Sequence, residues 1–127
     1  MQERNTVQRQ LVYHAVQELA CHPTADEVYE AVISTHPTVS KATVYRNLNK
    51  LADAGFLRKI QVPNAADRYD TTTPAHYHVY CRECGSFEDV DLPYLLTIDR
   101  EVERDTGYQL DDHDIVFSGV CPDCSTK

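Results

Sequence analysis

Two C-x-x-C pairs constrain the fold of this 127-residue chain more than any other feature: Cys81-Arg-Glu-Cys84 and Cys121-Pro-Asp-Cys124. Together they supply the four thiolates of a tetrahedral Zn²⁺ site, whereas a redox-active C-x-x-C needs one pair in a βαβ setting. We therefore predict a structural zinc site. The 36 residues between Cys84 and Cys121 must form structure of their own, because the zinc ties their two ends together.

Hydropathy and cysteine usage indicate the cellular compartment in which we expect the protein. No window approaches 18 apolar residues and no secretory leader opens the sequence, so we expect neither a membrane span nor export. A reducing cytoplasm fits thiolates that bind metal. The fifth cysteine, Cys21, has no partner in the sequence, and we expect a small buried side chain there rather than a reactive thiol.

The charge is distributed unevenly along the chain. Residues 1–73 hold eight basic and eight acidic side chains, whereas residues 74–127 hold four and twelve and carry the whole net charge of −8. Four zinc-bound thiolates would make the second half more negative still. If the protein contacts DNA, it therefore does so with residues 1–73.

The first half has the pattern of three helices. Residues 8–19 carry an apolar stripe, and the helix must end before Pro23. Thr24 and Glu27 form a capping box that opens a second helix, which stops near residue 34. Ser40 is a good N-cap for a third helix, which Gly55 is placed to end.

A β-hairpin is predicted after the third helix. Residues 56–62 alternate like a strand, residues 63–67 read as a turn, and residues 68–70 return. Three helices followed by a hairpin make a winged helix-turn-helix. Residues 71–74 are the predicted hinge, so we divide the chain into a DNA-binding domain, 1–73, and a second domain, 74–127.

The second domain is predicted to be a small αβ unit. Residues 76–81, 87–90 and 114–121 read as strands, and Pro93 suits the first turn of a helix that ends at Gly107. This unit has an apolar helix face but little mass, which favours a dimer. The predicted fold class is α+β, a winged helix followed by a zinc-stapled αβ dimerisation domain.

The outer face of the third helix is polar and basic, which is typical of recognition in a DNA major groove. Arg46 and Lys50 can reach guanine edges or phosphates, and Asn49 can pair with adenine. Thr43 and Tyr45 flank them, and on the hairpin Arg58, Lys59 and Arg68 can hold phosphates. The alternative is a solvated face on a helix that only packs.

A second metal site is suggested by the histidine pair His76 and His78. On a strand both side chains point to one face, about 7 Å apart along the chain. Cys81 has the opposite parity, so the thiolate site should be separate. Asp70 and Asp89 add carboxylates, although two partly exposed histidines on an edge strand remain the alternative. We expect surface or core roles for the remaining histidines, His14, His36 and His113.

Several motifs together resemble the Fur family of metal-dependent bacterial repressors over nearly the whole chain. They are Ala42-Thr-Val-Tyr45, the run from His76 to Gly85 and the run from Gly119 to Cys124. The resemblance implies a homodimer whose C-terminal halves associate and whose winged helices bind a palindromic DNA operator. It also implies that Cys81, Cys84, Cys121 and Cys124 hold the structural Zn²⁺.

The resemblance further implies a regulatory metal whose ligands come from both halves: His22, Asp70, His76, His78 and Asp89. Nitrogen and oxygen ligands without thiolate suit Fe²⁺ or Mn²⁺. Iron-sensing members tend to have glutamates where this chain has Asp70 and Asp89, so it is most similar to the peroxide-sensing PerR branch. That similarity implies iron-catalysed oxidation of His22 or His76 by peroxide, which releases the DNA.

Three other classes of protein are alternatives to this peroxide-sensing repressor. An iron-responsive repressor without peroxide chemistry is the nearest alternative. A non-haem iron oxygenase would use two histidines and one carboxylate, but five candidate ligands leave little room for substrate. A bare zinc-stabilised interaction module leaves the basic helix face unexplained. We therefore predict that the protein is not an enzyme and has no small organic substrate.

Overall fold

The computed structural model describes residues 2–19 and 22–126, together with the side chains from Thr6 onward outside the gap. Cys21 therefore lies outside the described residues. The chain forms two compact units, Met1–Thr73 and Pro74–Lys127, and each is described by itself. The mixture of helices and sheets confirms the predicted α+β class.

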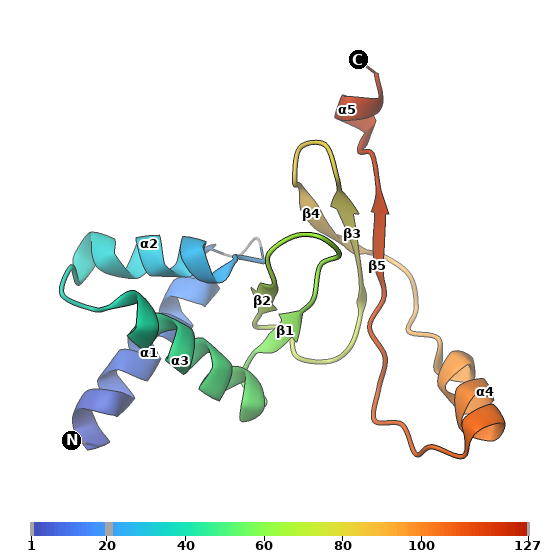
Figure 1. Ribbon diagram of the computed structural model, residues 1–127, viewed down its shortest axis with the longest axis horizontal. Coiled ribbons are helices and arrows are strands. Elements are labelled where there is room, and N and C mark those ends of the chain that lie inside the picture. The colour runs from blue at the N-terminus through green and yellow to red at the C-terminus, as the bar shows by residue number, and fades with distance from the viewer. Residues whose placement is uncertain (1, 20–21, 127) are drawn as a thin grey trace. The chain divides into compact units, whose positions relative to one another are not determined.

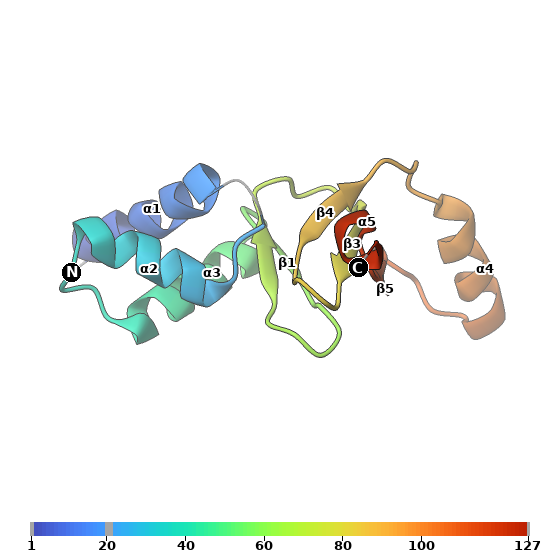
Figure 2. The same cartoon turned by 90° about the horizontal axis from the view of Figure 1, so that it is seen from above.

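Unit 1 contains three helices, α1 (Gln2–Leu19), α2 (Ala25–Thr35) and α3 (Lys41–Asp53). Each helix contacts the other two, and both views show them crossing one another (Figures 1 and 2). Their apolar faces meet in one core that also takes Tyr69 from the hairpin. The buried helix residues are Val12, Ala15, Val16, Val28, Val32, Val44, Leu48 and Leu51.

The predicted caps of α2 and α3 are present. The Glu27 amide donates to Thr24 Oγ1 at 3.3 Å, and the Thr24 amide donates to Glu27 Oε1 at 2.8 Å. Ser40 caps α3 through the Thr43 amide, at 3.1 Å. The third helix ends as predicted, with Ala54 as its C-cap and Gly55 as the residue directly after it. Gly55 follows with a φ of +86°, a conformation that glycine adopts without strain.

The wing consists of two short antiparallel strands, β1 (Arg58–Ile60) and β2 (Arg68–Asp70), in which Lys59 pairs with Tyr69. The second strand also holds the start of α2. The Tyr69 amide donates to the Pro23 carbonyl at 3.0 Å, and Thr24 forms an isolated bridge with Arg68. The wing thereby fixes the backbone on either side of Pro23.

Unit 2 is built on a three-stranded sheet with the order β4-β3-β5 (Figure 1). The strands are β3 (Tyr77–Cys81), β4 (Phe87–Val90) and β5 (Val116–Gly119). β3 pairs antiparallel with β4 and parallel with β5, and a parallel pair needs a long crossover connection. That connection contains α4 (Leu96–Thr106), which lies away from the three strands in both views (Figures 1 and 2).

Several details of unit 2 differ from the sequence prediction. β3 begins at Tyr77 and not at residue 76, and β5 spans Val116–Gly119 and not residues 114–121. Pro93 precedes α4 instead of opening it, since the helix begins only at Leu96. The amide of its N-cap residue, Leu95, donates to the Tyr77 hydroxyl at 2.9 Å. The sequence analysis also missed α5 (Pro122–Ser125), a single turn that starts at the proline of the second C-x-x-C pair. Gly107 ends α4 as predicted, in the left-handed conformation with a φ of +78°.

The capping box of α2 provides a test of how unit 1 is held together. Thr24→Ala should lower the free energy of unfolding of unit 1 by about 1 kcal/mol, because the Glu27 amide loses its acceptor. The measurement is urea unfolding followed by circular dichroism. Thr38→Ala, at an exposed position, is the matched control and should be close to neutral. Equal effects of the two substitutions would contradict the capping role.

Candidate metal centres and nucleic-acid interface

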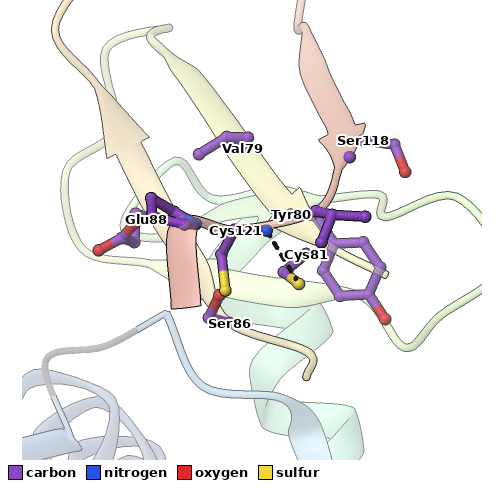
Figure 3. A pocket seen from close by; sticks show the side chains of 10 residues that line it. Val79, Tyr80, Cys81, Ser86, Glu88, Ser118 and Cys121 are labelled. Atoms are coloured by element: carbon purple, nitrogen blue, oxygen red, sulfur yellow. Dashed lines mark hydrogen bonds between the residues drawn. The ribbon is translucent and has the colours of Figure 1, made fainter. Parts of the chain in front are cut away.

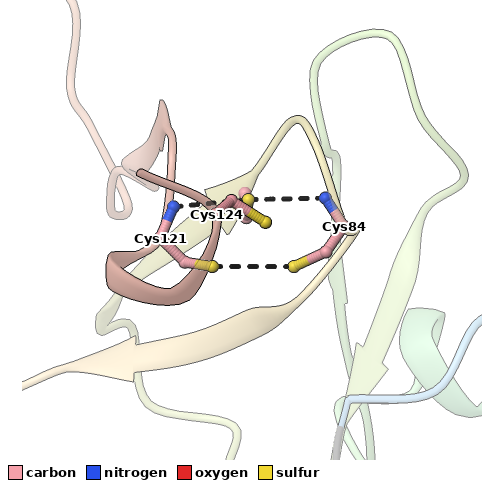
Figure 4. A group of neighbouring side chains, drawn as sticks. Cys84, Cys121 and Cys124 are labelled. Atoms are coloured by element: carbon pink, nitrogen blue, oxygen red, sulfur yellow. Dashed lines mark hydrogen bonds between the residues drawn. The ribbon is translucent and has the colours of Figure 1, made fainter. Parts of the chain in front are cut away.

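The four predicted zinc ligands come together in unit 2. Cys81 ends β3 and lies in register with Gly119 of β5, so the parallel pairing brings both C-x-x-C pairs to one end of the sheet. The four sulfur atoms all lie within 4.8 Å of one another. The Cys84 and Cys121 sulfurs face each other at 3.7 Å (Figure 4). A tetrahedral zinc with Zn–S bonds of about 2.3 Å separates its sulfurs by about 3.8 Å.

Backbone amides are aimed at one sulfur of this cage. The amides of Cys84 and Cys121 donate to Cys81 Sγ at 3.4 and 3.3 Å, and Figure 3 shows the second of these bonds. They lower the pKa of the Cys81 thiol to about 6. A hydrogen bond with Cys121 instead raises the pKa of Cys124 to about 12, so this thiol must lose a proton when a cation binds. The geometry and the donor set fit a thiophilic ion such as Zn²⁺.

A second donor set in unit 2 consists of His76, His78 and Asp89. Asp89 lies on β4 directly opposite His78 of β3. His76 immediately precedes β3, and the centroid of its ring is 4.3 Å from that of the His78 ring. The Nε2 atoms of His76 and His78 lie 3.0 and 3.2 Å from the same carboxylate oxygen, Asp89 Oδ1. His78 is buried and stacks on Phe87.

The hydrogen bonding of His76 indicates that this donor set suits a cation. His76 Nδ1 lies 2.9 Å from the Pro74 carbonyl oxygen, which can only accept, so the ring carries its proton on Nδ1. In the neutral ring Nε2 then presents a lone pair to the Asp89 carboxylate. Two lone pairs at 3.0 Å repel each other unless a proton or a metal ion lies between them. A backbone carbonyl on Nδ1 is also the usual second partner of a metal-bound histidine.

The two predicted ligands of unit 1 also lie together. His22 Nε2 is 3.2 Å from Asp70 Oδ2. Asp70 ends β2, while His22 precedes the Pro23 segment that β2 holds. The His22 backbone has a φ of +55°, which is uncommon for a residue with a side chain, and Arg68 donates to its carbonyl at 3.0 Å. Unit 1 therefore positions one imidazole and one carboxylate as a pair.

The predicted DNA-reading side chains share the outer face of α3. Tyr45, Arg46, Asn49 and Lys50 are exposed, whereas Val44 and Leu48 are fully buried on the opposite face. Thr43 contributes its hydroxyl, which accepts from Arg46 at 3.3 Å, and its carbonyl, which accepts from Asn47 at 2.9 Å. The helix therefore presents a polar row that its own hydrogen bonds organise.

Asp26 and Lys41 also belong to the surroundings of this polar row, although the sequence did not indicate them. The Tyr45 hydroxyl donates to Asp26, and Lys41 lies 3.2 Å from the same carboxylate and over the rings of Tyr29 and Tyr45. The hydrogen bond from Tyr45, and then the one from Lys41, lowers the pKa of Asp26. The Tyr45 ring is thus held in place by α2. The sequence signal was the Asp26 position in the first turn of α2, although the contact itself spans 19 residues.

The hairpin cations have different surroundings. Lys59 is partly exposed and 3.6 Å from Asp67, and Arg58 donates to the Thr73 carbonyl at 3.3 Å. Arg68, which the sequence analysis grouped with them as a phosphate contact, is better explained as structural. Its side chain is only 17% exposed, with its guanidinium on the His22 carbonyl and 3.7 Å from Glu27.

Comparison with known proteins identifies the class. The model of the ferric uptake regulator family matches residues 1–118, so the chain belongs to that family. Its members are transcription regulators that bind metals and DNA as dimers, and they are not enzymes. Among the residues that the structure describes, no helix is long and apolar enough to cross a membrane.

Individual relatives narrow the comparison. The chain is 35% identical over 124 residues, or 98% of its length and 84% of the relative's, to the peroxide-responsive repressor PerR of Staphylococcus aureus strain USA300. It resembles the solved Campylobacter jejuni peroxide stress regulator with a TM-score of 0.76 and 31% identity, covering 95% of this chain and 91% of that one. The Helicobacter pylori ferric uptake regulator Fur, with a TM-score of 0.77 and 24% identity over 93% and 79% of the chains, shares the fold.

The thiolate cage can be tested by metal content. Cys84→Ser should remove bound zinc and unfold unit 2, because a hydroxyl does not replace a thiolate at a site with this sulfur spacing. Zinc is measured by elemental analysis of the purified protein, and folding by amide exchange across β3. Cys21→Ser is the matched control and should keep one zinc per chain. Zinc retained after Cys84→Ser would refute the four-sulfur cage.

The nitrogen and oxygen donor set has its own test. Asp89→Asn should weaken Mn²⁺ binding at least about tenfold, because the amide removes the anion that both imidazoles face. Affinity is measured by calorimetry on the zinc-loaded protein. Asp91→Asn, an exposed aspartate two residues along, is the control and should leave Mn²⁺ affinity unchanged. Unchanged binding in both variants would remove Asp89 from the site.

Proposed function

We propose that this protein is a DNA-binding repressor whose affinity for its operator is set by a regulatory Fe²⁺ or Mn²⁺ and which loses that affinity when peroxide oxidises the iron form. The carrying observation is the pair of donor sets, His22 with Asp70 in unit 1 and the His76, His78 and Asp89 set in unit 2. Both sets contain imidazole and carboxylate and no thiol, which suits Fe²⁺ or Mn²⁺.

One ion that takes ligands from both sets would join the two units across residues 71–75. Such an ion stabilises only those arrangements of the units in which all five ligands can reach it. By linkage, it strengthens DNA binding to the extent that the DNA-binding arrangement binds the metal better than the others do. This gives the metal a regulatory role without requiring it to contact DNA.

Zinc is proposed for the cysteine cage, with a purely structural role. Cys81, Cys84, Cys121 and Cys124 would all bind as thiolates, which leaves no open position for chemistry. The 3.7 Å sulfur separation and the two amides on Cys81 support this assignment.

The DNA partner is proposed to be a palindromic duplex bound by a homodimer in the cytoplasm. The exposed row on α3 supports base reading by Tyr45, Arg46, Asn49 and Lys50, with Thr43 ordering Arg46. Arg58 and Lys59 of the wing would contact phosphates. Two copies are needed because so few cations give weak binding, and the exposed apolar side chains of α4 offer a surface for self-association.

The peroxide response is proposed at His22 or His76. Fe²⁺ held by these ligands would supply the redox chemistry that cleaves the O–O bond of hydrogen peroxide: one oxygen atom would enter a C–H bond of the imidazole ring and the other would leave as water, so that the two-electron oxidation of the ring balances the reduction of the peroxide. Either imidazole would then gain one oxygen atom and become a poorer ligand, so the metal site fails and the DNA is released. Similarity to the peroxide-responsive repressor and the peroxide stress regulator supports this over an iron-responsive repressor without peroxide chemistry, which is the second candidate. A non-haem iron oxygenase finds no support, since family members are not enzymes.

The deciding experiment compares Fe²⁺-loaded and Mn²⁺-loaded protein on an operator selected from random duplexes, before and after stoichiometric peroxide. We expect loss of binding only with Fe²⁺, together with one added oxygen atom on a peptide that contains His22 or His76. Asp89→Glu should slow this oxidation if that carboxylate tunes the iron. Retained binding, or cysteine oxidation with zinc release as the only change, would reject peroxide sensing and leave the iron-responsive repressor.

DNA recognition by α3 has a separate test. Arg46→Ala should lower operator affinity by about tenfold to a hundredfold, since a guanidinium on a base edge contributes about 1–3 kcal/mol. Binding is measured by fluorescence anisotropy at several salt concentrations with the Mn²⁺-loaded protein. Arg100→Ala removes an exposed arginine from α4 and is the control. Equal losses in both variants would show that α3 does not read the operator.

A further inference from the structure

A polar cluster in unit 2 plays no part in either metal centre. It joins Tyr77 of β3, Tyr94 ahead of α4, Asp99 within α4 and His113 ahead of β5. Tyr77 is 1% exposed and Asp99 is 8% exposed, so these two side chains are largely shielded from water. The His113 ring stacks on Tyr94 with centroids 4.3 Å apart and lies 5.6 Å from the Tyr77 ring.

Donors and acceptors can be assigned consistently to all the hydrogen bonds of this cluster. The Leu95 amide donates to the Tyr77 hydroxyl at 2.9 Å, so that hydroxyl can donate its own proton to His113 Nε2 at 2.7 Å. His113 then carries its proton on Nδ1, which faces Asp99 Oδ1. The other Asp99 oxygen accepts from Tyr94 at 3.1 Å, and the Tyr94 hydroxyl accepts from the His113 amide at 2.8 Å. Every group therefore has the partner it requires.

This cluster replaces the apolar packing that usually holds a helix on a sheet. Of the eleven residues of α4, only Asp99 is buried. The apolar side chains of the helix and its N-cap point to solvent, with exposures of 37–57% at Leu95, Leu96, Ile98 and Val102. A helix that buries a carboxylate and exposes its leucines is anchored by polar bonds, because the hydrophobic effect alone would turn it the other way.

Tyr77 also connects this anchor to the metal-binding strand. Tyr77 opens β3 and lies between His76, which immediately precedes the strand, and His78, and successive side chains along a strand point to opposite faces. The two imidazoles converge on Asp89 on one face, while the Tyr77 hydroxyl reaches the N-cap of α4 on the other. The same three residues of backbone therefore position both features.

We propose that Tyr77 is a positioning residue for self-association: through His113 and Asp99 its hydroxyl holds α4 in the orientation that offers its exposed apolar face to a second copy of this chain. The exposed apolar side chains Leu95, Ile98 and Val102 lie three and four residues apart and so share one face of the helix, and members of the family are dimers, so the same face of a second copy is the surface proposed to cover them. The inference rests on the proposed homodimer. It requires no metal at the nitrogen and oxygen donor set.

The test uses Tyr77→Phe in zinc-loaded protein without added Fe²⁺ or Mn²⁺, with Tyr108→Phe as the control. Tyr108 is 71% exposed, so that variant removes a phenolic hydroxyl near α4 from outside the cluster. We expect the Leu95 amide to exchange at least about tenfold faster in Tyr77→Phe, as loss of one or two hydrogen bonds implies. The dimer dissociation constant from sedimentation equilibrium should rise about tenfold. Zinc content and amide exchange within β3 should match the control.

A second variant, Asp99→Asn, keeps the shape of the carboxylate but presents an amide donor to one of the two groups that donate to it. It should accelerate exchange at Leu95 in the same way. If Leu95 exchanges at the control rate in both variants, or if the dimer constant does not move while Leu95 exchange accelerates, the inference is overturned. A wild-type chain that sediments as a monomer instead overturns the proposed homodimer, independently of the exchange result.

Discussion

The parallel pairing of β3 with β5, closed by the cysteine cage at one end, is the constraint on which the rest of unit 2 depends. Residues 74–126 bury very little: Tyr77, His78, Cys81, Phe87 and Asp99. A unit of this size with so small a core needs a covalent or metal staple. A zinc on four thiolates contributes on the order of 10 kcal/mol to folding, which is comparable to the whole stability of a typical domain.

β3 and the residue before it position three features of unit 2, because their successive side chains point to opposite faces of the sheet. His76 and His78 face Asp89, whereas Tyr77 and Cys81 have the other parity and serve the anchor of α4 and the cysteine cage. Because the strand is central in the sheet order, its backbone is held on both sides by β4 and β5. This five-residue strand and the residue before it therefore keep the histidine and carboxylate donor set, the cysteine cage and the proposed association surface in fixed relation within unit 2.

Unit 1 has equal numbers of acidic and basic residues, and it nevertheless presents exposed basic side chains along one face of α3. Its acids are partly taken up by pairs: Asp26 holds Tyr45 and Lys41, Asp67 lies near Lys59, and Glu27 lies near Arg68. Arg46, Asn49 and Lys50 are left exposed on α3. The cations that remain on the surface are thus concentrated on the helix that we propose reads DNA.

The sequence by itself determined the elements and the chemistry of the sites. Thr24 with Glu27 and Ser40 marked helix starts because caps are local, and the period-2 spacing of His76 and His78 put both on one face. Two C-x-x-C pairs predicted that four cysteines gather at one site, because four thiolates match the coordination number of zinc, and the four sulfurs do lie together. Family resemblance, rather than spacing, selected His22 over His36 as a metal ligand.

Only the tertiary structure decided which distant residues meet. The Tyr45 bond to Asp26, the Arg68 bond to the His22 carbonyl and the Tyr77 bond to His113 join positions 19, 46 and 36 residues apart, and no local pattern predicts such contacts. The bond from the Leu95 amide to the Tyr77 hydroxyl, 18 residues away, belongs with them. Local rules determine which element a segment can form, whereas hydrogen bonds across the fold determine which distant residues that element contacts.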